Sequence, residues 1–144
     1  MRVVVGSDEE SELARAVAHA LSEAGHGVEI IGGIAGGADD WADVGLRIAA
    51  RVAAGQVDEG VAMCWTGTGV AMAANRVPGA RAALCGDAET ARGARRWNDA
   101  NILVLSNRAT TPAVGLEILR AWLEPTVTDP SEMSAIAKLD PSGP

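Results

Sequence analysis

The sequence predicts an α/β fold: a three-layer α/β/α sandwich around a five-stranded parallel sheet. Short aliphatic runs alternate with stretches that carry apolar residues at helical spacing, five times along the 144 residues. The aliphatic runs are continuous, as in strands that helices cover on both faces. Neither an internal repeat nor a linker divides the chain, so we expect one domain over residues 1–144.

The five expected strands each end at a glycine, a serine or a cysteine. The first is Val-Val-Val, which Gly6-Ser-Asp8 ends, and the third ends at Cys64. Turn signals such as Pro78-Gly79 separate the later ones. The strands are expected at residues 3–5, 28–31, 60–64, 81–85 and 101–106.

The segments between the strands carry helix signals. Leu13, Val17 and Leu21 form one apolar stripe, and Gly25 ends that helix. Thr111 followed by Pro112 is a typical helix start. Residues 32–40 are rich in glycine, and we expect a loop without regular structure there. Helices are expected at residues 11–23, 40–54, from the loop after Cys64 to 75, 89–97, 112 to about 123, and about 130–139.

Composition limits the function classes. The net charge is −7 and no basic run occurs, so nucleic acid and anionic membranes are not expected as partners. No apolar run approaches the roughly 20 residues that span a bilayer, and the N-terminus turns polar too early for a signal peptide. We expect a cytoplasmic protein. Two cysteines make no disulfide framework, and His19 and His26 lack neighbouring ligands, so we expect no metal.

Residues 61–76, Val-Ala-Met-Cys-Trp-Thr-Gly-Thr-Gly-Val-Ala-Met-Ala-Ala-Asn-Arg, are the most informative segment. They predict a buried strand, a glycine loop and the start of a helix, with Cys64 where the strand ends. Parallel α/β folds place their chemistry at that point. A thiol near the positive end of a helix favours the reactive thiolate. Cys64 is therefore either a proton-transfer or nucleophilic group, or a small buried apolar residue.

Several other side chains also have two interpretations. Trp122 and Cys85 are expected in the core, whereas the other tryptophans either pack or line a pocket. The arginines at positions 92, 95 and 96 form a solvated face or bind an anion. The acidic group Asp39, Asp40 and Asp43 starts a helix or takes part in a proton relay, and Asn75 and Asn98 cap helices or line a site.

Two rival functions also have a basis in the sequence. Gly67-Thr-Gly69 after a strand begins a dinucleotide-binding fingerprint, and Asp87 follows the next strand as a ribose-binding acid would. Met72 occupies the third glycine position, however, which disfavours a nucleotide cofactor. The other rival is a simple interaction domain without a ligand.

Five segments resemble, in the same order, ribose-5-phosphate isomerase B and the related galactose-6-phosphate isomerase subunits. The most specific are Ala-Ala-Asn-Arg-Val-Pro-Gly-Ala-Arg-Ala-Ala and Asn-Asp-Ala-Asn, and the resemblance covers roughly residues 2 to 123. The matching segments are Gly6-Ser-Asp8, Asp40-Trp-Ala-Asp43, Cys64-Trp-Thr-Gly-Thr-Gly69, residues 73–85 and residues 97–103.

The resemblance implies a flavodoxin-like strand order, 2-1-3-4-5. It also implies a homodimer or a dimer of dimers with shared active sites, in which the short terminal helix is available to pack on a partner subunit. Aldose and ketose would interconvert through an enediol without a cofactor or metal. By resemblance the catalytic residues are Cys64 as base, Thr66 and Asp8. The substrate-binding residues are Glu9, Asp40, Trp41, Trp65, Gly67, Thr68, Gly69, Trp97, Asn98 and Arg108.

The chain departs from the family pattern within the expected pocket. Glu9 replaces a histidine that helps to bind phosphate, and a carboxylate repels phosphate. The family arginines after the last long helix are missing from residues 124–133, although Arg108 is retained. Trp97 replaces the histidine that opens the sugar ring, and tryptophan cannot shuttle a proton at neutral pH. Trp65 and Trp41 replace a glycine and a tyrosine.

Two accounts fit these departures. In the first, an active isomerase keeps its proton-transfer core but acts on an unphosphorylated or otherwise atypical sugar, bound partly by Arg108. In the second, the chain is an inactive ligand-binding or partner subunit of the same fold. The coherent arrangement of thiol and glycine loop favours the first account.

Overall fold

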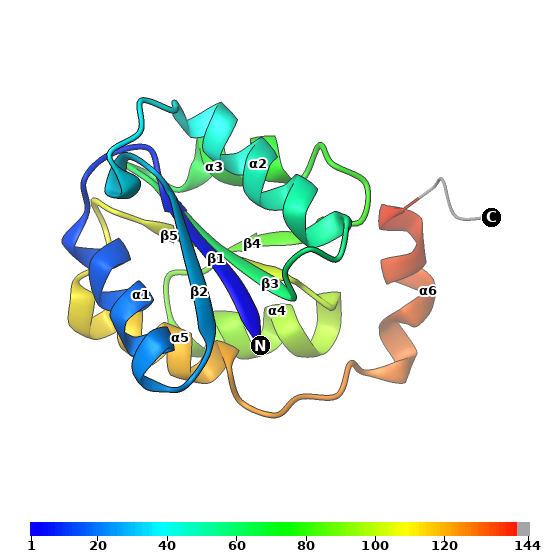
Figure 1. Cartoon of the computed structure of the whole chain (residues 1–144). Helices are drawn as coiled ribbons and strands as arrows, with labels where there is room; N and C mark the ends of the chain where they lie inside the picture. The colour runs from blue at the N-terminus through cyan, green and yellow to red at the C-terminus, as the bar shows by residue number, and fades with distance from the viewer. Residues whose placement is uncertain (141–144) are drawn as a thin grey trace.

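The computed structural model describes residues 1–140 and has the three layers that the sequence predicts (Figure 1). The strands are β1 (Arg2–Ser7), β2 (Gly27–Gly32), β3 (Glu59–Cys64), β4 (Ala82–Leu84) and β5 (Ile102–Ser106). The long helices are α1 (Glu12–Glu23), α2 (Trp41–Ala53), α3 (Thr68–Ala74), α4 (Ala88–Asn98) and α5 (Pro112–Trp122). All strands pair in parallel, which confirms the fold class.

The expected strand order 2-1-3-4-5 is wrong, because the sheet has the order β2-β1-β3-β5-β4. All five residues of β5 are buried, so this strand takes an interior position between β3 and β4. In contrast, β4 has three partly exposed residues and lies at the edge. The Asn75 side chain covers part of that edge, since it both donates to Ala82 O (2.9 Å) and accepts from Ala82 N (2.8 Å). An edge strand blunted in this way is protected from further pairing.

Two apolar clusters cover the two faces of the sheet. The larger one packs α1, α4 and α5 against alternate residues of the inner strands, and it contains Trp122 and Cys85 as expected. The other packs α2 and α3 against the opposite face (Figure 1). Cys64 belongs to this second cluster. The thiol therefore lies under α2 and α3.

Residues 32–40 are not entirely irregular, contrary to expectation. Gly33–Ala35 form a single 3₁₀ turn, which Gly36 ends in the left-handed conformation (φ 77°). Ile34 anchors this turn because its side chain is buried (4% exposed). One anchoring apolar residue thus orders a segment that its glycine content alone marks as a loop.

The C-terminal segment is helical, as expected, but in short pieces: η2 (Pro130–Glu132), α6 (Met133–Ile136) and η3 (Ala137–Leu139). It lies beside the body of the domain (Figure 1). Asp140 attaches its end, accepting from Gly79 N (2.7 Å) and pairing with Arg81 (3.3 Å). Among residues 1–140, no helix combines the length and apolar character needed to cross a membrane.

A buried ion pair joins the layers at the amino end of β3. Glu59 is 7% exposed; it accepts from Trp122 Nε1 (2.7 Å) and pairs with Arg95 (2.8 Å). The Arg95 guanidinium also lies 5.0 Å from the centre of the Trp122 ring, a cation–π distance. The Arg95 side chain is thus mostly covered (24% exposed) and packs against the core. Arg92 and Arg96 pair instead with Glu124 (2.7 Å) and Asp129 (4.0 Å).

We expect Glu59→Gln to lower the free energy of unfolding by about 3 kcal/mol, because it leaves the Arg95 charge largely buried without a counter-ion. Chemical denaturation at fixed protein concentration measures the loss. The matched control is Glu29→Gln, which breaks the more exposed Arg51–Glu29 pair (2.7 Å) and is expected to cost under about 1 kcal/mol. Equal losses in the two variants would contradict the structural importance of Glu59.

Candidate active site

Three strands deliver polar residues to the carboxyl edge of the sheet. The register pairs Ser7 with Met63, and Cys64 with Ser106. Asp8 follows β1, Cys64 ends β3, and Arg108 follows β5 by two residues. Carboxyl ends of parallel strands are where α/β folds bind ligands. The sequence-predicted residues Asp8, Cys64 and Arg108 therefore belong to one edge of the molecule.

Cys64 and the loop that follows it form a compact turn from β3 into α3. The thiol residue is 4% exposed, whereas Trp65 beside it is 60% exposed. Gly67 adopts φ 78°, a left-handed conformation that favours glycine, so the turn depends on this residue. The first intrahelical bond of α3 runs from Ala71 N to Gly67 O (3.2 Å). The N–H groups of residues 68–70 thus have no acceptor in the helix.

The two threonines of the loop are in contact. Thr66 Oγ1 and Thr68 Oγ1 lie 2.8 Å apart and share one hydrogen bond. Gly69 is covered by Trp41, because a Cβ at Gly69 would lie 2.9 Å from that indole ring. Glycine at this position lets the tryptophan approach the start of α3. Trp41 thus joins the loop as expected, although 47% of the residue stays exposed.

Asp40 has a structural role in this arrangement. Its side chain accepts from Asp43 N (2.8 Å) while Asp43 accepts from Asp40 N (3.4 Å), which is a capping box at the start of α2. Asp39 pairs with Arg47. The helix-start interpretation therefore accounts for all three acidic residues.

Asp8 is the electrostatically unusual group. Its Oδ1 is buried and has no hydrogen-bond partner among residues 1–140. Burial raises the pKa of Asp8 above its ordinary value, the nearby Asp40 charge raises it slightly further, and backbone N–H groups partly oppose the shift. A carboxyl group that binds its proton more tightly than usual is suited to proton transfer.

Glu9 and Trp65 border a cavity of about 290 Å³ at this edge, together with Asn107 and Thr110. Arg108 borders a second cavity of about 290 Å³ with Thr66, Cys85 and Ser106. Within residues 1–140, the Arg108 guanidinium makes no ion pair, whereas Arg15 pairs with Glu10. Negative charge thus predominates at the cavity beside Glu9, and the unpaired cation, Arg108, lies at the second cavity.

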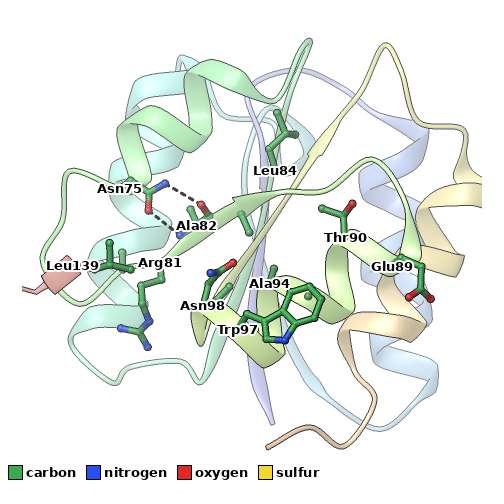
Figure 2. Close-up of a pocket in the computed structure, with 14 residues that line it drawn as sticks. Asn75, Arg81, Ala82, Leu84, Glu89, Thr90, Ala94, Trp97, Asn98 and Leu139 are labelled. Carbon is green, nitrogen blue, oxygen red and sulfur yellow. Dashed lines mark hydrogen bonds between the residues drawn. The ribbon is translucent and has the colours of Figure 1, made fainter. Parts of the chain in front are cut away.

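Trp97 and Asn98 do not join these residues within one chain. They end α4, which starts after the carboxyl end of β4 and runs back along the sheet. Both line a groove of about 690 Å³ along the exposed edge of β4, together with Asn75, Arg81 and Leu139 (Figure 2). Trp97 packs on Gly93, where a Cβ would lie 2.8 Å from its ring, and remains 52% exposed.

The polar residues that hold the edge together were not predicted from the sequence. Ser106 Oγ donates to Trp65 O (2.9 Å), and Asn107 N donates to Cys64 O (3.0 Å). The Asn107 side chain reaches Ser7 Oγ (3.2 Å). These polar residues end apolar runs, so their positions after the strands were a usable signal. In the part of the chain that the structure describes, no three His, Cys, Asp or Glu side chains could hold a metal ion.

Comparison with known proteins gives the family. The profile of the Ribose/Galactose Isomerase family matches residues 3–139. A putative sugar phosphate isomerase of Bacillus subtilis is 36% identical over 72% of this chain and 69% of its own length. Ribose-5-phosphate isomerase B of Escherichia coli is 35% identical over 74% of this chain and 71% of its own length.

The fold agrees with that assignment. The solved structure of ribose-5-phosphate isomerase B from Clostridium thermocellum superposes with a TM-score of 0.91 at 35% identity, covering 98% of this chain and 96% of that one. The match extends over the C-terminal segment, where the sequence resemblance fades. The chain therefore belongs to the Ribose/Galactose Isomerase family and is an aldose–ketose isomerase of the ribose-5-phosphate isomerase B type.

Proposed function

We propose that this isomerase uses Cys64 as its base and acts through an enediol on a sugar that is unphosphorylated or otherwise atypical. The observation that carries the proposal is the junction of β3 and α3. A thiol ends a central strand there, and a glycine turn follows it directly, whose N–H groups at the start of α3 have no acceptor within that helix. A base and an oxyanion site are the two parts that enediol chemistry requires.

The proton steps follow from these positions. The Cys64 thiolate removes the proton from the carbon next to the carbonyl, and the C–H electrons form the C=C bond of the enediolate. The carbonyl oxygen gains the negative charge, which the N–H groups of residues 66–69 stabilise, at roughly 3–4 kcal/mol per well-placed donor. The thiol then returns the proton to the neighbouring carbon. Asp8, with its raised pKa, moves the hydroxyl proton between the two oxygens.

The charge distribution supports an atypical substrate. Glu9 borders the cavity on the β1 side, where the neighbouring Glu10 is paired with Arg15, and Arg108 is the cation at the edge that no described carboxylate neutralises. A phosphate dianion would meet the Glu9 carboxylate on one side and a single guanidinium on the other. One cation suffices for a carboxylate or for a neutral sugar with several hydroxyl groups.

We further propose that two copies of this one-domain chain share their active sites. Trp97 and Asn98 line the β4 groove, while Cys64 lies at the carboxyl ends of the strands. Both residues can reach a Cys64 site only if a second chain supplies them. The groove beside β4 and the C-terminal segment, which carries the exposed Met133 and Leu139, offer apolar surface for such an association.

We expect Cys64→Ala to abolish proton exchange at the carbon next to the carbonyl, by at least about a thousandfold, while the fold stays intact. Deuterium incorporation by NMR in heavy water measures this over free pentoses, hexoses, tetroses and uronates and their phosphates. The control is Cys85→Ala: burial raises the pKa of that thiol to about 12, so it supplies no thiolate at neutral pH. Unchanged exchange in Cys64→Ala would refute the mechanism.

Shared sites predict complementation between inactive chains. We expect Cys64→Ala and Trp97→Ala each to lose activity alone, whereas a 1:1 mixture of refolded chains recovers about one quarter of wild-type activity. That fraction follows because half of the dimers are mixed and each mixed dimer keeps one intact site. A fully active Trp97→Ala, or a mixture without recovery, would contradict shared sites.

The raised pKa of Asp8 predicts a pH-dependent effect on stability. A raised folded-state pKa means that the charged form opposes folding, so the stability present below the unfolded pKa of about 3.9 is lost as pH rises through the folded pKa. We therefore expect Asp8→Asn to raise the midpoint temperature of thermal unfolding at pH 7 but not at pH values near 3 to 4. Asp87→Asn is the opposite control, because its bond from Thr90 N lowers the pKa of Asp87. A pH-independent gain in Asp8→Asn would contradict this account.

A further inference from the structure

A polar cluster at the carboxyl edge is not used by the chemistry proposed above. It consists of Ser7, Glu9, Ser11 and Asn107, from the end of β1, the start of α1 and the loop after β5. Ser7 is fully buried and Ser11 is 7% exposed. Hydroxyl groups buried to this extent need hydrogen-bond partners, and Asn107 supplies one to each.

The bonds fix which way the Asn107 amide faces. Ser11 Oγ accepts from Ala14 N (3.0 Å) as the cap of α1, and its single proton goes to Asn107 Oδ1 (2.7 Å). The amide nitrogen therefore faces the other way. It donates to Ser7 Oγ (3.2 Å), with Glu9 Oε1 at 3.5 Å from the same nitrogen. Because the Glu9 carboxylate can only accept, the amide nitrogen is the group that suits this side, and it presents donors toward Glu9.

Asn107 also bonds to β3, the strand that ends at Cys64. Asn107 N donates to Cys64 O (3.0 Å), and Arg108 N donates to Trp65 O (2.9 Å). Glu9 is itself attached to the cluster through its backbone, since Glu9 N donates to Ser7 Oγ (3.4 Å). Asn107 thus connects the strand end that carries the proposed base with the loop that carries Glu9.

We infer that Asn107 is a positioning residue that holds the Glu9 carboxylate in the cavity beside Trp65. There the carboxylate accepts a hydrogen bond from a hydroxyl group at the substrate end remote from the reacting carbons. The substrate class is then a sugar with a neutral hydroxyl terminus, and a terminal phosphate is excluded by repulsion from Glu9. This inference rests on the proposed isomerase function. The inference adds to that function the residue pair that sets the substrate preference, Glu9 held by Asn107.

The bond between Asn107 and Glu9 is tested by exchanging the hydrogen-bond donor and acceptor between the two residues. In Asn107→Asp the bond from Ser11 is still available, but two carboxylates now face each other and Glu9 is displaced. We expect KM for the preferred unphosphorylated sugar to rise about tenfold, with kcat within about twofold. In the double variant Glu9→Gln with Asn107→Asp, the glutamine amide donates to the aspartate, and KM is expected to return to within about threefold of wild type. A purely structural role of Asn107 would not be rescued by a change at Glu9.

The charge test uses Glu9→Gln alone, with free ribose and ribose 5-phosphate as the probes. We expect the ratio of kcat/KM for the free sugar to that for the phosphate to fall at least about tenfold, because the repulsion is removed. Glu10→Gln is the matched control: it borders the same cavity and removes the same charge, but Arg15 already neutralises that carboxylate. Its ratio is expected to stay within about twofold of wild type.

The outcomes separate the inference from the function on which it rests. If wild type catalyses no Cys64-dependent exchange on any sugar, both are overturned. If wild type is active but prefers ribose 5-phosphate, the inference and the proposed substrate class are overturned together, while the Cys64 mechanism stands. If Glu9→Gln and Glu10→Gln shift the ratio equally, only the inference is overturned. Should Asn107→Asp fail to fold by circular dichroism, the comparison of Glu9→Gln with Glu10→Gln decides alone.

Discussion

The rest of the structure depends on β3 being buried on both faces and paired at both edges. All six of its residues are buried, and it pairs with β1 on one side and β5 on the other. An unpaired polar or charged residue at either buried end of this strand would lower the stability of the fold. Its amino end therefore carries Glu59 with two partners, and its carboxyl end carries Cys64, a residue that tolerates burial. The position of the thiol follows from the packing of the sheet.

The acidic groups at the two ends of the sheet differ in whether they have bonding partners. Glu59 is satisfied by an indole N–H and a guanidinium, which ties α4 and α5 to the strand. Asp8, at the other end, has a buried oxygen without a partner among residues 1–140, and burial raises its pKa. An unsatisfied polar atom is tolerated where chemistry needs it and is compensated elsewhere. The paired carboxylate supports the fold, and the unpaired one is the group that we propose to transfer the proton.

Local patterns in the sequence were enough to predict the elements and the carboxyl edge. The apolar runs placed every strand, and Ser11, Asp40 and Thr111 marked helix starts that the structure confirms. The order of β4 and β5 is a matter of relative burial, since both runs are short and apolar. Only the fuller burial of β5 and the Asn75 bond to β4 decide which strand is interior. The pairing of Asn107 with Ser7, across 100 positions of sequence, cannot be found from local periodicity.

The departures from the family pattern acquire a common explanation once the geometry is known. Glu9 and Ser11 stand in the loop after β1, and Asn107 stands in the loop after β5, yet their side chains form one cluster. Glu9, in place of the histidine that helps to bind phosphate, disfavours a phosphate at the far end of the substrate. Trp97 in place of the ring-opening histidine changes the other requirement, because an indole cannot transfer the proton that opens a cyclic sugar. The substrate that we propose ends in a hydroxyl group and reacts in its open-chain form. Such a substrate satisfies both changes and leaves the proposed chemistry of the thiol and the glycine turn intact.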